Sequence, residues 1–182
     1  DGYKVLMIDL DSQGSLSSIF GAQVEDEWQT IFPLLARHYA ETLRSDNQRR
    51  IDRGEAPVAM DDSLADALKI KAGDLIRPTH WPNIDLIGAQ LNLYWAEFQI
   101  PVWRMAARGW KLWDALTETL ATDGVLDQYD LIFLDTPPAL GYLTINGLAA
   151  ADIVLVPFGA SFLEFDSTGR FFDMLHSTFA SI

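Results

Sequence analysis

The chain has 182 residues, 49% hydrophobic and 21% charged, so it is long enough to bury a core and has the composition of a globular protein. Its net charge of −13 argues against a strong nucleic-acid binder, because phosphate groups must be neutralised by cationic side chains. The absence of cysteine excludes disulfides and thiolate metal sites, and no apolar run reaches the ~18 residues that a membrane-spanning helix needs.

The first predicted element is a strand that ends in acidic residues. Residues 4–8 read Lys-Val-Leu-Met-Ile, and Asp9 and Asp11 follow before a Ser-Gln-Gly turn. A short, continuous apolar run is typical of a strand that is buried on both faces of a parallel sheet. A short helix is then predicted over residues 15–20.

One long helix is predicted over residues 25–53. Pro33 fits its first turn, where a missing N–H costs nothing. The apolar residues of this segment recur at helical spacing, at Ile31, Leu35, Ala36, Tyr39 and Leu43.

A second, shorter helix is predicted after a turn at residues 53–57. The Asp-Asp-Ser sequence at 61–63 predicts an N-cap, and the helix over 64–71 is expected to end before Gly73. Residues 23–75 are therefore predicted to be a helical insertion. The insertion either docks a partner or simply covers one edge of the sheet.

The middle of the chain is predicted to hold another strand and a helix. Two prolines favour an extended conformation over residues 75–82, and residues 84–88 form the next predicted strand. Residues 91–100 are predicted to be helical up to an interruption at Pro101. One face of that helix carries Leu91, Tyr94, Trp95 and Phe98.

A further helix, rich in tryptophan, is predicted over residues 103–122, with its end at Gly124. The side chains expected to face the core are Trp110, Trp113, Leu116 and Leu120. A tryptophan cluster can bind a base or a partner, but packing between helices is favoured here. The three histidines share no metal-site spacing and are interpreted as structural.

The segment around which the chain is organised is Tyr-Asp-Leu-Ile-Phe-Leu-Asp-Thr-Pro-Pro, residues 129–138. It predicts a buried strand that ends at Asp135, because the two prolines prevent its continuation. Ligands of open parallel sheets bind beyond the carboxyl ends of the strands. Asp9, Asp11 and Asp135 are therefore expected at one edge, where a hard divalent cation such as Mg²⁺ would relieve their repulsion.

The last part of the chain is predicted to add a helix over 143–151, a strand over 153–156 that ends at Pro157, and a final helix. Asp166-Ser167-Thr168 is the predicted N-cap of the final helix, and its apolar face carries Phe171, Leu175 and Phe179. Strands alternating with helices predict one α/β domain over residues 1–182, with a mostly parallel, twisted sheet and helices on both faces.

Four of these stretches, in this order, resemble ParA-type partition ATPases, the deviant Walker-A group that also contains the MinD cell-division regulators. Residues 5–14 are similar to the second strand and switch segment of that family, and residues 84–89 to a third strand. Residues 129–138 resemble its Walker B strand, and residues 143–157 the helix and strand that come next. The resemblance implies a P-loop NTPase-like fold and an ATP-dependent switch in DNA partition.

The resemblance also implies roles for individual residues. Asp135 would hold Mg²⁺, usually through a water, and Asp11 would be the catalytic residue that positions or activates the attacking water. Asp9 would support the metal or the phosphate-binding lysine, while Asn146 and Pro157 fall in segments expected near ATP. The alternative for acids at strand ends is that they cap the helices that follow.

Two departures from the family pattern stand out. The phosphate-binding loop K-G-G-x-x-K-S/T and its strand should precede Asp9, and no such sequence is found in the chain. Ser12 occupies a position where the family usually has proline. The expectation is a chain truncated at the N-terminus, and also at the C-terminus, that neither hydrolyses ATP nor dimerises although the full-length protein would.

The resemblance further implies a homodimer in the ATP-bound state, a centromere-binding ParB-like partner, and non-specific DNA contacts through regions outside this chain. It implies a bacterial cytoplasmic protein associated with the nucleoid and not with a membrane.

Two alternatives remain. A phospho-accepting receiver domain also ends strands in such acids, but far more chain separates Asp11 from Asp135 than in receivers. A non-catalytic scaffold could have kept the fold and lost the loop.

Overall fold

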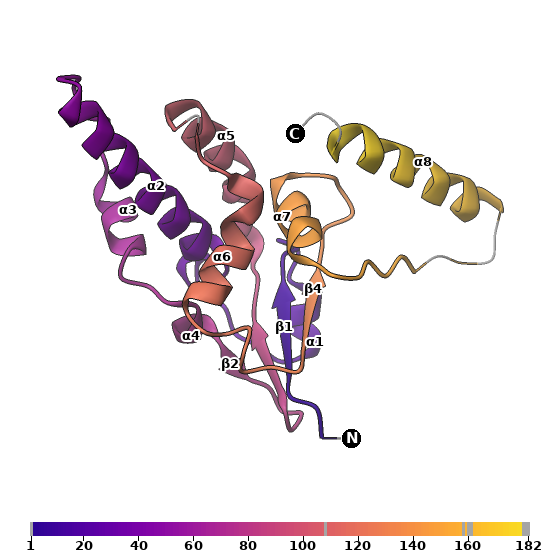
Figure 1. The fold of residues 1–182 in the computed structure, drawn as a ribbon. Helices are drawn as coiled ribbons and strands as arrows, with labels where there is room; N and C mark the ends of the chain where they lie inside the picture. Colours follow the sequence, from indigo (N-terminus) through magenta and orange to yellow (C-terminus); the bar gives the residue numbers. More distant parts are fainter. Residues whose placement is uncertain (1, 108, 158, 160–161, 180–182) are drawn as a thin grey trace. The chain divides into compact units, whose positions relative to one another are not determined.

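The computed structural model describes residues 2–107, 109–157, 159 and 162–179 (Figure 1). They form two compact units, Asp1–Ala151 and Asp152–Ile182, and each is described by itself. Among the described residues, the first unit contains the sheet and every helix but one. The second contains the helix α8 (Phe162–Phe179).

The sheet of the first unit has four strands in the order β2-β3-β1-β4. The strand β1 (Val5–Asp9) pairs in parallel with β3 (Ile84–Ile87) on one side and with β4 (Leu131–Asp135) on the other. The short β2 (Arg77–Pro78) is antiparallel to β3 at one edge. The prediction of a mostly parallel sheet built from the three apolar runs is thus confirmed.

The helices of the first unit, given with their bounds, are α1 (Ser15–Ile19), η1 (Glu27–Gln29), α2 (Phe32–Asp52), α3 (Asp62–Ala67), α4 (Ala72–Leu75), η2 (Leu91–Trp95), α5 (Ala96–Ala106), η3 (Leu112–Asp114), α6 (Ala115–Thr122) and α7 (Tyr142–Ala150). The symbol η marks a 3₁₀ helix. The helix α2 packs on α3 and α6, and α7 packs on α5, α6 and η3.

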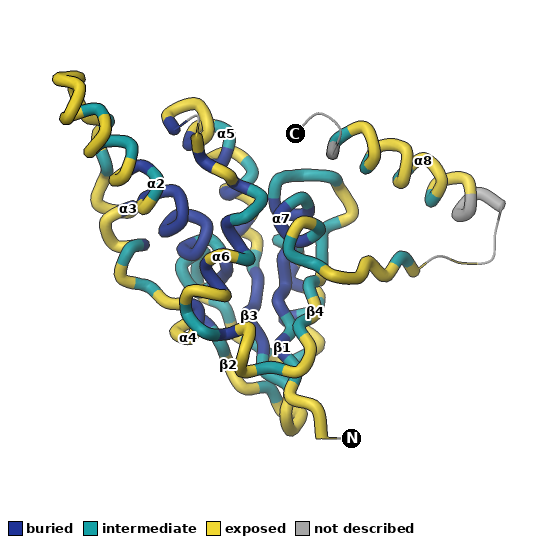
Figure 2. The backbone as a smooth tube through the Cα atoms, in the orientation of Figure 1, coloured by how far each residue is buried: buried dark blue, intermediate teal, exposed yellow. Residues whose placement is uncertain are grey.

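The core lies between the sheet and the layer of α2, α5 and α6 (Figure 2). Leu6 and Ile8 of β1 are fully buried, and each such side chain contributes about 1.5–3 kcal/mol. Tyr39 stacks on Trp103 with ring centroids 5.1 Å apart, and Trp110 meets Tyr39 edge-on at 5.3 Å. The interpretation of the tryptophans as core packing is therefore correct for Trp103 and Trp110.

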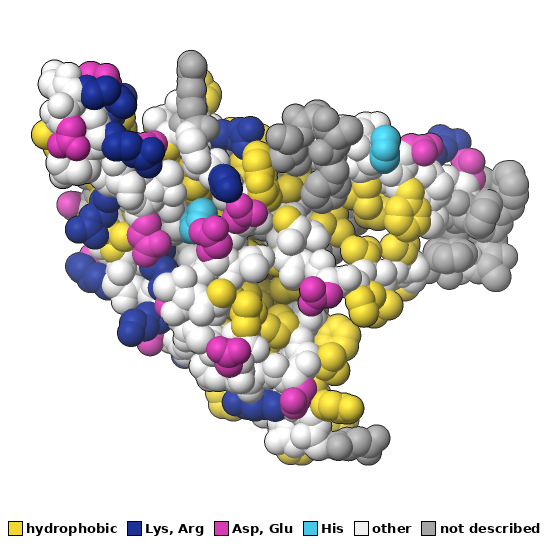
Figure 3. Space-filling view, in the orientation of Figure 1, with side chains coloured by type: hydrophobic (Ala, Val, Ile, Leu, Met, Phe, Trp, Pro, Cys, Tyr) yellow, Lys and Arg dark blue, Asp and Glu magenta, His cyan; other side chains and the backbone are white. Residues whose placement is uncertain are grey.

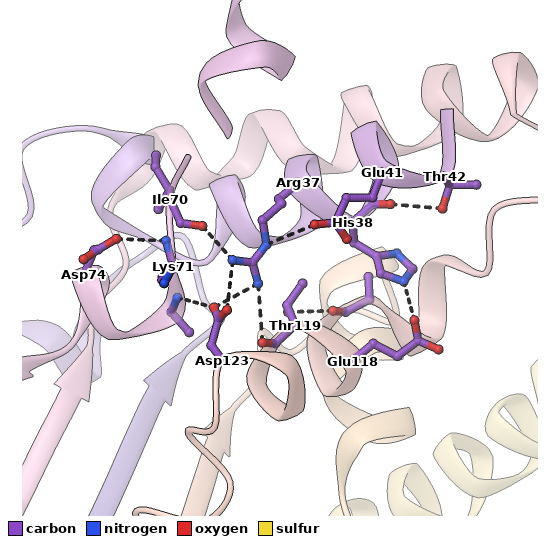
Figure 4. Close-up of polar contacts among 12 residues, drawn as sticks. Arg37, His38, Glu41, Thr42, Ile70, Lys71, Asp74, Glu118, Thr119 and Asp123 are labelled. Atoms are coloured by element: carbon purple, nitrogen blue, oxygen red, sulfur yellow. Dashed lines mark hydrogen bonds and ion pairs between the residues drawn. The ribbon is translucent and has the colours of Figure 1, made fainter. Parts of the chain in front are cut away.

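Buried hydrogen bonds and an ion pair join α2 to α6 and to the segment before α4 (Figure 4). The guanidinium of Arg37 lies 2.9 Å from Asp123, just after α6, and donates to the carbonyl of Ile70 at 2.7 Å. Trp110 donates its indole N–H to Nδ1 of His38 at 2.8 Å. The opposite ring nitrogen of His38, Nε2, therefore carries the proton and lies 2.8 Å from a Glu118 oxygen.

The long helix predicted over 25–53 is wrong at its start. The side chain of Asp26 accepts from the backbone N–H of Trp28 and caps the separate 3₁₀ turn η1. Thr30 then accepts from the N–H of Phe32, where α2 begins with Pro33 in its first turn, as expected. The hydrogen bonds that Asp26 and Thr30 accept thus replace the start of the predicted helix with a separate 3₁₀ turn.

The second predicted helix, over 64–71, is also shorter than expected. Asp61 is its N-cap and accepts from Leu64 at 2.9 Å, as predicted, but α3 ends at Ala67. Gly73 does not end a helix; it lies inside the separate α4, whose first N–H, on Ala72, donates to Asp123. The start of α4 is therefore held both by this tertiary contact and by a local one, in which the N–H of Lys71 donates to Asp74 at 2.9 Å.

Pro101 does not interrupt the chain's next helix, because α5 runs through it to Ala106. The flanking side chains of Ile100 and Trp103 are buried, and this burial outweighs the hydrogen bond that proline removes. The continuous helix predicted over 103–122 is also wrong, since α5 ends and α6 begins only at Ala115.

Two predictions for the last part of the chain are wrong as well. Residues 153–156 are not a strand: Ile153, Val154 and Leu155 are exposed, and no strand in the part of the chain that the structure describes pairs with them. A strand needs a neighbour to satisfy its backbone groups. The predicted N-cap at Asp166 lies inside α8, where Asp166 pairs with Arg170 at 2.6 Å. Among the described helices, none is long and apolar enough to cross a membrane.

Candidate functional site

The carboxyl ends of β1 and β4 bring acidic residues together. Asp9 and Asp135 are direct partners in the parallel register, and the backbone N–H of Leu10 donates to the carbonyl of Asp135 at 2.8 Å. Because the sheet is parallel here, both carboxylates lie at the same edge, followed by the loops that leave the sheet. The predicted gathering of the strand-end acids is confirmed for this pair.

Asp9 is fully buried and its two oxygens are occupied by the protein. One accepts from the N–H and the hydroxyl of Ser17 at 2.9 and 2.7 Å, and the other accepts from the N–H of Asp11 at 3.1 Å. Ser17 in turn accepts from the N–H of Ala89 after β3. Burial raises the pKa of Asp9, while the hydrogen bonds from Ser17 and Asp11 oppose the rise. Asp9 therefore organises the loop between β1 and α1.

Asp11 is half-buried and keeps one oxygen uncommitted. One carboxylate oxygen accepts from the N–H of Gln13 at 3.0 Å, which forms a tight turn. The other oxygen has no hydrogen-bond partner within the described part of the chain. Gly14 follows with φ of +62°, and a Cβ there would lie 2.9 Å from the carbonyl of Ala89. The loop is thus held against β3, with a free acceptor on Asp11.

Asp135 is exposed, and its side chain has no hydrogen-bond partner among the residues that the structure describes. Desolvation raises its pKa most, and the negative charges of Asp9 and Asp11 raise it further. The three acids therefore share one electrostatic environment, as expected. An uncommitted carboxylate in such an environment is suited to a hard cation.

The described residues do not by themselves complete a metal site. Over the described residues, no group of three or more His, Cys, Asp or Glu side chains is arranged to hold an ion. Mg²⁺ is commonly bound by one or two carboxylates, with waters and phosphate oxygens as its other ligands. Asp135 fits that mode, because it offers one accessible carboxylate beside a second, partly exposed one on Asp11.

The remaining predicted site residues are Asn146 and Pro157. Asn146 is fully buried in α7, where its amide donates to the carbonyl of Tyr142 at 3.0 Å, and its Oδ1 has no partner among the described residues. Pro157 is exposed and belongs to the second unit, which is described separately. The structure therefore gathers Asp9, Asp11 and Asp135 at one edge of the sheet.

Two features of the site were missed by sequence reasoning. Glu97 of α5 accepts from the backbone N–H groups of Tyr142 and Leu143 at 2.8 and 2.9 Å, and so caps α7 just after the loop that follows Asp135. A cleft of about 510 Å³ lies beside the Asp11 loop. Residues that line it include Ser12, Gln13, Gly14, Ala89, Gln90 and Leu91. Neither feature has a local signal, because each joins segments that are distant in the sequence.

Comparisons with known proteins agree with this geometry. A family profile described as an AAA domain matches residues 1–178, including the insertion predicted at 23–75. The chromosome partitioning protein ParA of Caulobacter vibrioides is 29% identical over 91% of this chain and 48% of its own length. The chain belongs to the AAA domain family of ParA-type partition ATPases.

Other members and neighbours extend the comparison. The putative replication protein A of Sinorhizobium fredii is 32% identical over 96% of this chain and 36% of its own length. Cobyrinic acid a,c-diamide synthase from Mycobacterium smegmatis, solved with an ATP analog and magnesium, has the same fold. Its TM-score is 0.63 at 24% identity, over 97% of this chain and 56% of that one. The chain spans less than half the length of the two curated relatives named above.

Proposed function

We propose that this chain is part of an ATP-dependent partition ATPase that segregates plasmid or chromosomal DNA. The observation that carries the proposal is the register pairing of Asp9 with Asp135, which sets Asp11 and Asp135 at one edge with uncommitted carboxylate oxygens. Family membership and the ATP analog and magnesium in a protein of the same fold support it.

Each acid has a separate part in this proposal. Mg²⁺, when bound, neutralises charge on the terminal phosphates of ATP. Asp135 would hold it, usually through a water. The free oxygen of Asp11 would accept a hydrogen bond from the attacking water and so position or activate it. Asp9 contacts neither, because Ser17 and the N–H of Asp11 occupy both of its oxygens, and instead it keeps the Asp11 loop in place.

The proposal also covers the phosphate-binding loop and the residues that contact the rest of the nucleotide. No phosphate-binding loop sequence occurs in residues 1–182, so these residues alone are proposed not to hydrolyse ATP. Pro157 is proposed to lie near the base. Asn146 is also proposed to contact the nucleotide. Its side chain is fully buried in this structure, so that contact requires α7 to move.

We further propose a homodimer in the ATP-bound state, a ParB-like partner, and an association with the nucleoid in the bacterial cytoplasm. Direct DNA contact is assigned to regions outside these residues. Lys and Arg side chains gather over α2 in Figure 3, but acids lie among them. Arg49 pairs with Asp46 at 3.2 Å and Arg53 with Glu55 at 2.8 Å, so these two cations are already neutralised.

The test uses the full-length protein and the substitution Asp135→Asn. We expect Mg²⁺-dependent ATP binding and hydrolysis to fall by more than about tenfold, the usual effect of losing a group that orients a metal or its waters. Asp130→Asn is the matched control, because Asp130 lies at the other end of β4 and accepts from the backbone N–H of Lys4.

Equal activity in Asp135→Asn and the parent protein would refute the assigned role. A parent protein that binds no Mg²⁺-ATP would instead favour the non-catalytic scaffold. The receiver interpretation is set aside, since the chain belongs to the partition family.

A further inference from the structure

The helix α7 has no N-terminal cap of its own. Its N-cap residue, Gly141, has no side chain to accept a hydrogen bond, and its first turn holds no acidic residue. The N–H groups of Tyr142 and Leu143 have no partner inside α7, because the first four N–H groups of a helix lie ahead of the intrahelical bonds. An acceptor from outside the helix is therefore needed.

Glu97 of α5 supplies that acceptor, from 45 positions before Tyr142. One carboxylate oxygen accepts from the N–H of Tyr142 at 2.8 Å, and the other accepts from the N–H of Leu143 at 2.9 Å. The helices α5 and α7 pack on each other (Figure 1), and a negative charge at the positive end of a helix dipole is stabilising. Glu97 thus takes the place of a local cap and fixes where α7 begins.

The glycine at 141 leaves room for this carboxylate. A Cβ on Gly141 would lie 2.5 Å from Oε1 of Glu97 and 2.8 Å from Oε2. The backbone of Gly141 is extended, with φ of −93° and ψ of −175°, a conformation that any residue adopts. The contact with Glu97, and not the turn itself, therefore requires glycine at this position.

The loop between Asp135 and α7, residues 136–141, is held by α7; we call it the Asp135 loop. The hydroxyl of Thr144, in the first turn of α7, donates to the carbonyl of Ala139 at 2.6 Å. Gly147 lies so close to the beginning of the loop that a Cβ there would be 3.1 Å from Cγ2 of Thr136. The position of α7 consequently sets the path of the Asp135 loop.

Asp135 itself is fixed independently of α7. The backbone N–H of Leu10 donates to the carbonyl of Asp135 at 2.8 Å, and Asp135 is the register partner of Asp9 in the sheet. Loss of the contact between Glu97 and α7 would therefore displace the Asp135 loop and leave the carboxylate proposed to hold Mg²⁺ in place.

We propose that Glu97 is a positioning residue for ATP hydrolysis, which acts through α7 to hold the Asp135 loop in the conformation that turnover requires. This inference rests on the proposed function and adds a residue of α5 to the site without giving it a contact with nucleotide or metal. A displacement of about 1 Å beside reacting groups can slow a reaction by about a hundredfold. Because Asp135 keeps its place, turnover falls while binding of Mg²⁺-ATP is preserved.

The first measurement needs no activity: hydrogen exchange of residues 136–145 in the full-length protein, followed by mass spectrometry. We expect Glu97→Ala to speed exchange there by more than about tenfold, because two hydrogen bonds to a charged group are lost. Glu97→Gln keeps one acceptor oxygen and should fall between the two. Asp61→Ala is the matched control, since it removes the carboxylate that caps α3 and should speed exchange only in residues 62–68.

A second variant removes the contact without removing the carboxylate. Gly141→Ala is compatible with the backbone conformation, but its Cβ pushes the carboxylate of Glu97 away from α7. We expect it to speed exchange of residues 136–145 as Glu97→Ala does. In the double variant the two effects should not add, because both substitutions break the same contact.

The second measurement is steady-state ATP hydrolysis, with kcat expressed per molecule that binds nucleotide, so that an unfolded fraction does not count. For Glu97→Ala we expect kcat to fall by more than about tenfold while KM for Mg²⁺-ATP stays within about twofold. Glu97→Gln should recover part of the loss. Asp61→Ala should keep the kcat of the parent, although it too loses a helix cap.

The proposal fails if Glu97→Ala leaves exchange of residues 136–145 at the rate of the parent. It also fails if exchange rises but kcat does not fall, or if Asp61→Ala lowers kcat as much as Glu97→Ala does. These outcomes leave the proposed function standing as long as Asp135→Asn lowers activity. A parent protein without Mg²⁺-dependent hydrolysis would instead refute the proposed function and the role in turnover together, while exchange would still decide whether Glu97 holds the Asp135 loop.

Discussion

Removing the guanidinium of Arg37 is predicted to be among the most damaging single changes in the first unit. Its Nη1 and Nη2 atoms donate to both oxygens of Asp123 at 3.2 and 2.9 Å, and to the carbonyls of Ile70 and Thr119 at 2.7 and 3.4 Å. The side chains of Arg37 and Asp123 are 6% and 8% exposed, so water cannot replace these contacts (Figure 4).

Arg37→Met fills a similar volume but leaves Asp123 as a buried carboxylate with one remaining donor, the N–H of Ala72 at 2.6 Å. Breaking a buried ion pair from one side costs about 3–5 kcal/mol. Since small domains are stable by about 5–15 kcal/mol, the loss is a large share of the total. Urea unfolding followed by circular dichroism measures it.

The double variant Arg37→Met/Asp123→Asn separates the explanations. Asparagine keeps an oxygen for the N–H of Ala72 and removes the unpaired charge, so the double variant is expected to be more stable than Arg37→Met alone. Arg53→Met, which breaks an exposed pair with Glu55, is the control and is expected to unfold at the parent's urea midpoint. A loss below about 1 kcal/mol in Arg37→Met, or a double variant weaker than the single one, would refute the reasoning.

Two further predictions concern the acidic edge and its loop. Asp11→Asn removes a like charge, so the pKa of Asp135 should fall, as followed by carbon NMR of its carboxyl group. The raised pKa of the Asp135 carboxyl makes the free energy of unfolding fall as the pH rises above 3.8, because the folded chain then holds its proton more tightly than the unfolded chain does. Asp135→Asn should lessen that fall. An unchanged dependence of the free energy of unfolding on pH would contradict the assignment. Gly14→Ala is expected to destabilise by about 1–3 kcal/mol in thermal unfolding, given its positive φ and the carbonyl of Ala89 at 2.9 Å, whereas Gly73→Ala in α4 has open space and should not.

Local sequence was sufficient for the three parallel strands. Apolar runs predicted β1, β3 and β4, and those of β1 and β4 end in acids. The burial predicted for β4 is wrong: Leu131 and Phe133 are 46% and 45% exposed, because β4 lies at the edge of the described sheet. The acids at the ends of β1 and β4 were also identified in advance as the candidate site. Both results depend only on residues that are neighbours in the chain.

Contacts between distant segments decided the rest. Three contacts show this. Asp9 pairs with Asp135 across 126 positions, Glu97 caps α7 at Tyr142 across 45, and Arg37 pairs with Asp123 across 86. No local pattern encodes them, since each depends on which elements become neighbours.

The errors have the same origin. Residues 153–156 have the apolar composition of a strand, yet a strand exists only where another backbone can bond to it, and none does so among the described residues. Six apolar side chains of η2 and α5 likewise have the composition of a core face but remain exposed: Leu91, Tyr94, Trp95, Phe98, Val102 and Met105. Sequence determined which segments are apolar and where the acids stand. Only the tertiary structure determined which apolar faces are covered and which acids meet, because burial and pairing are properties of the neighbours that folding supplies.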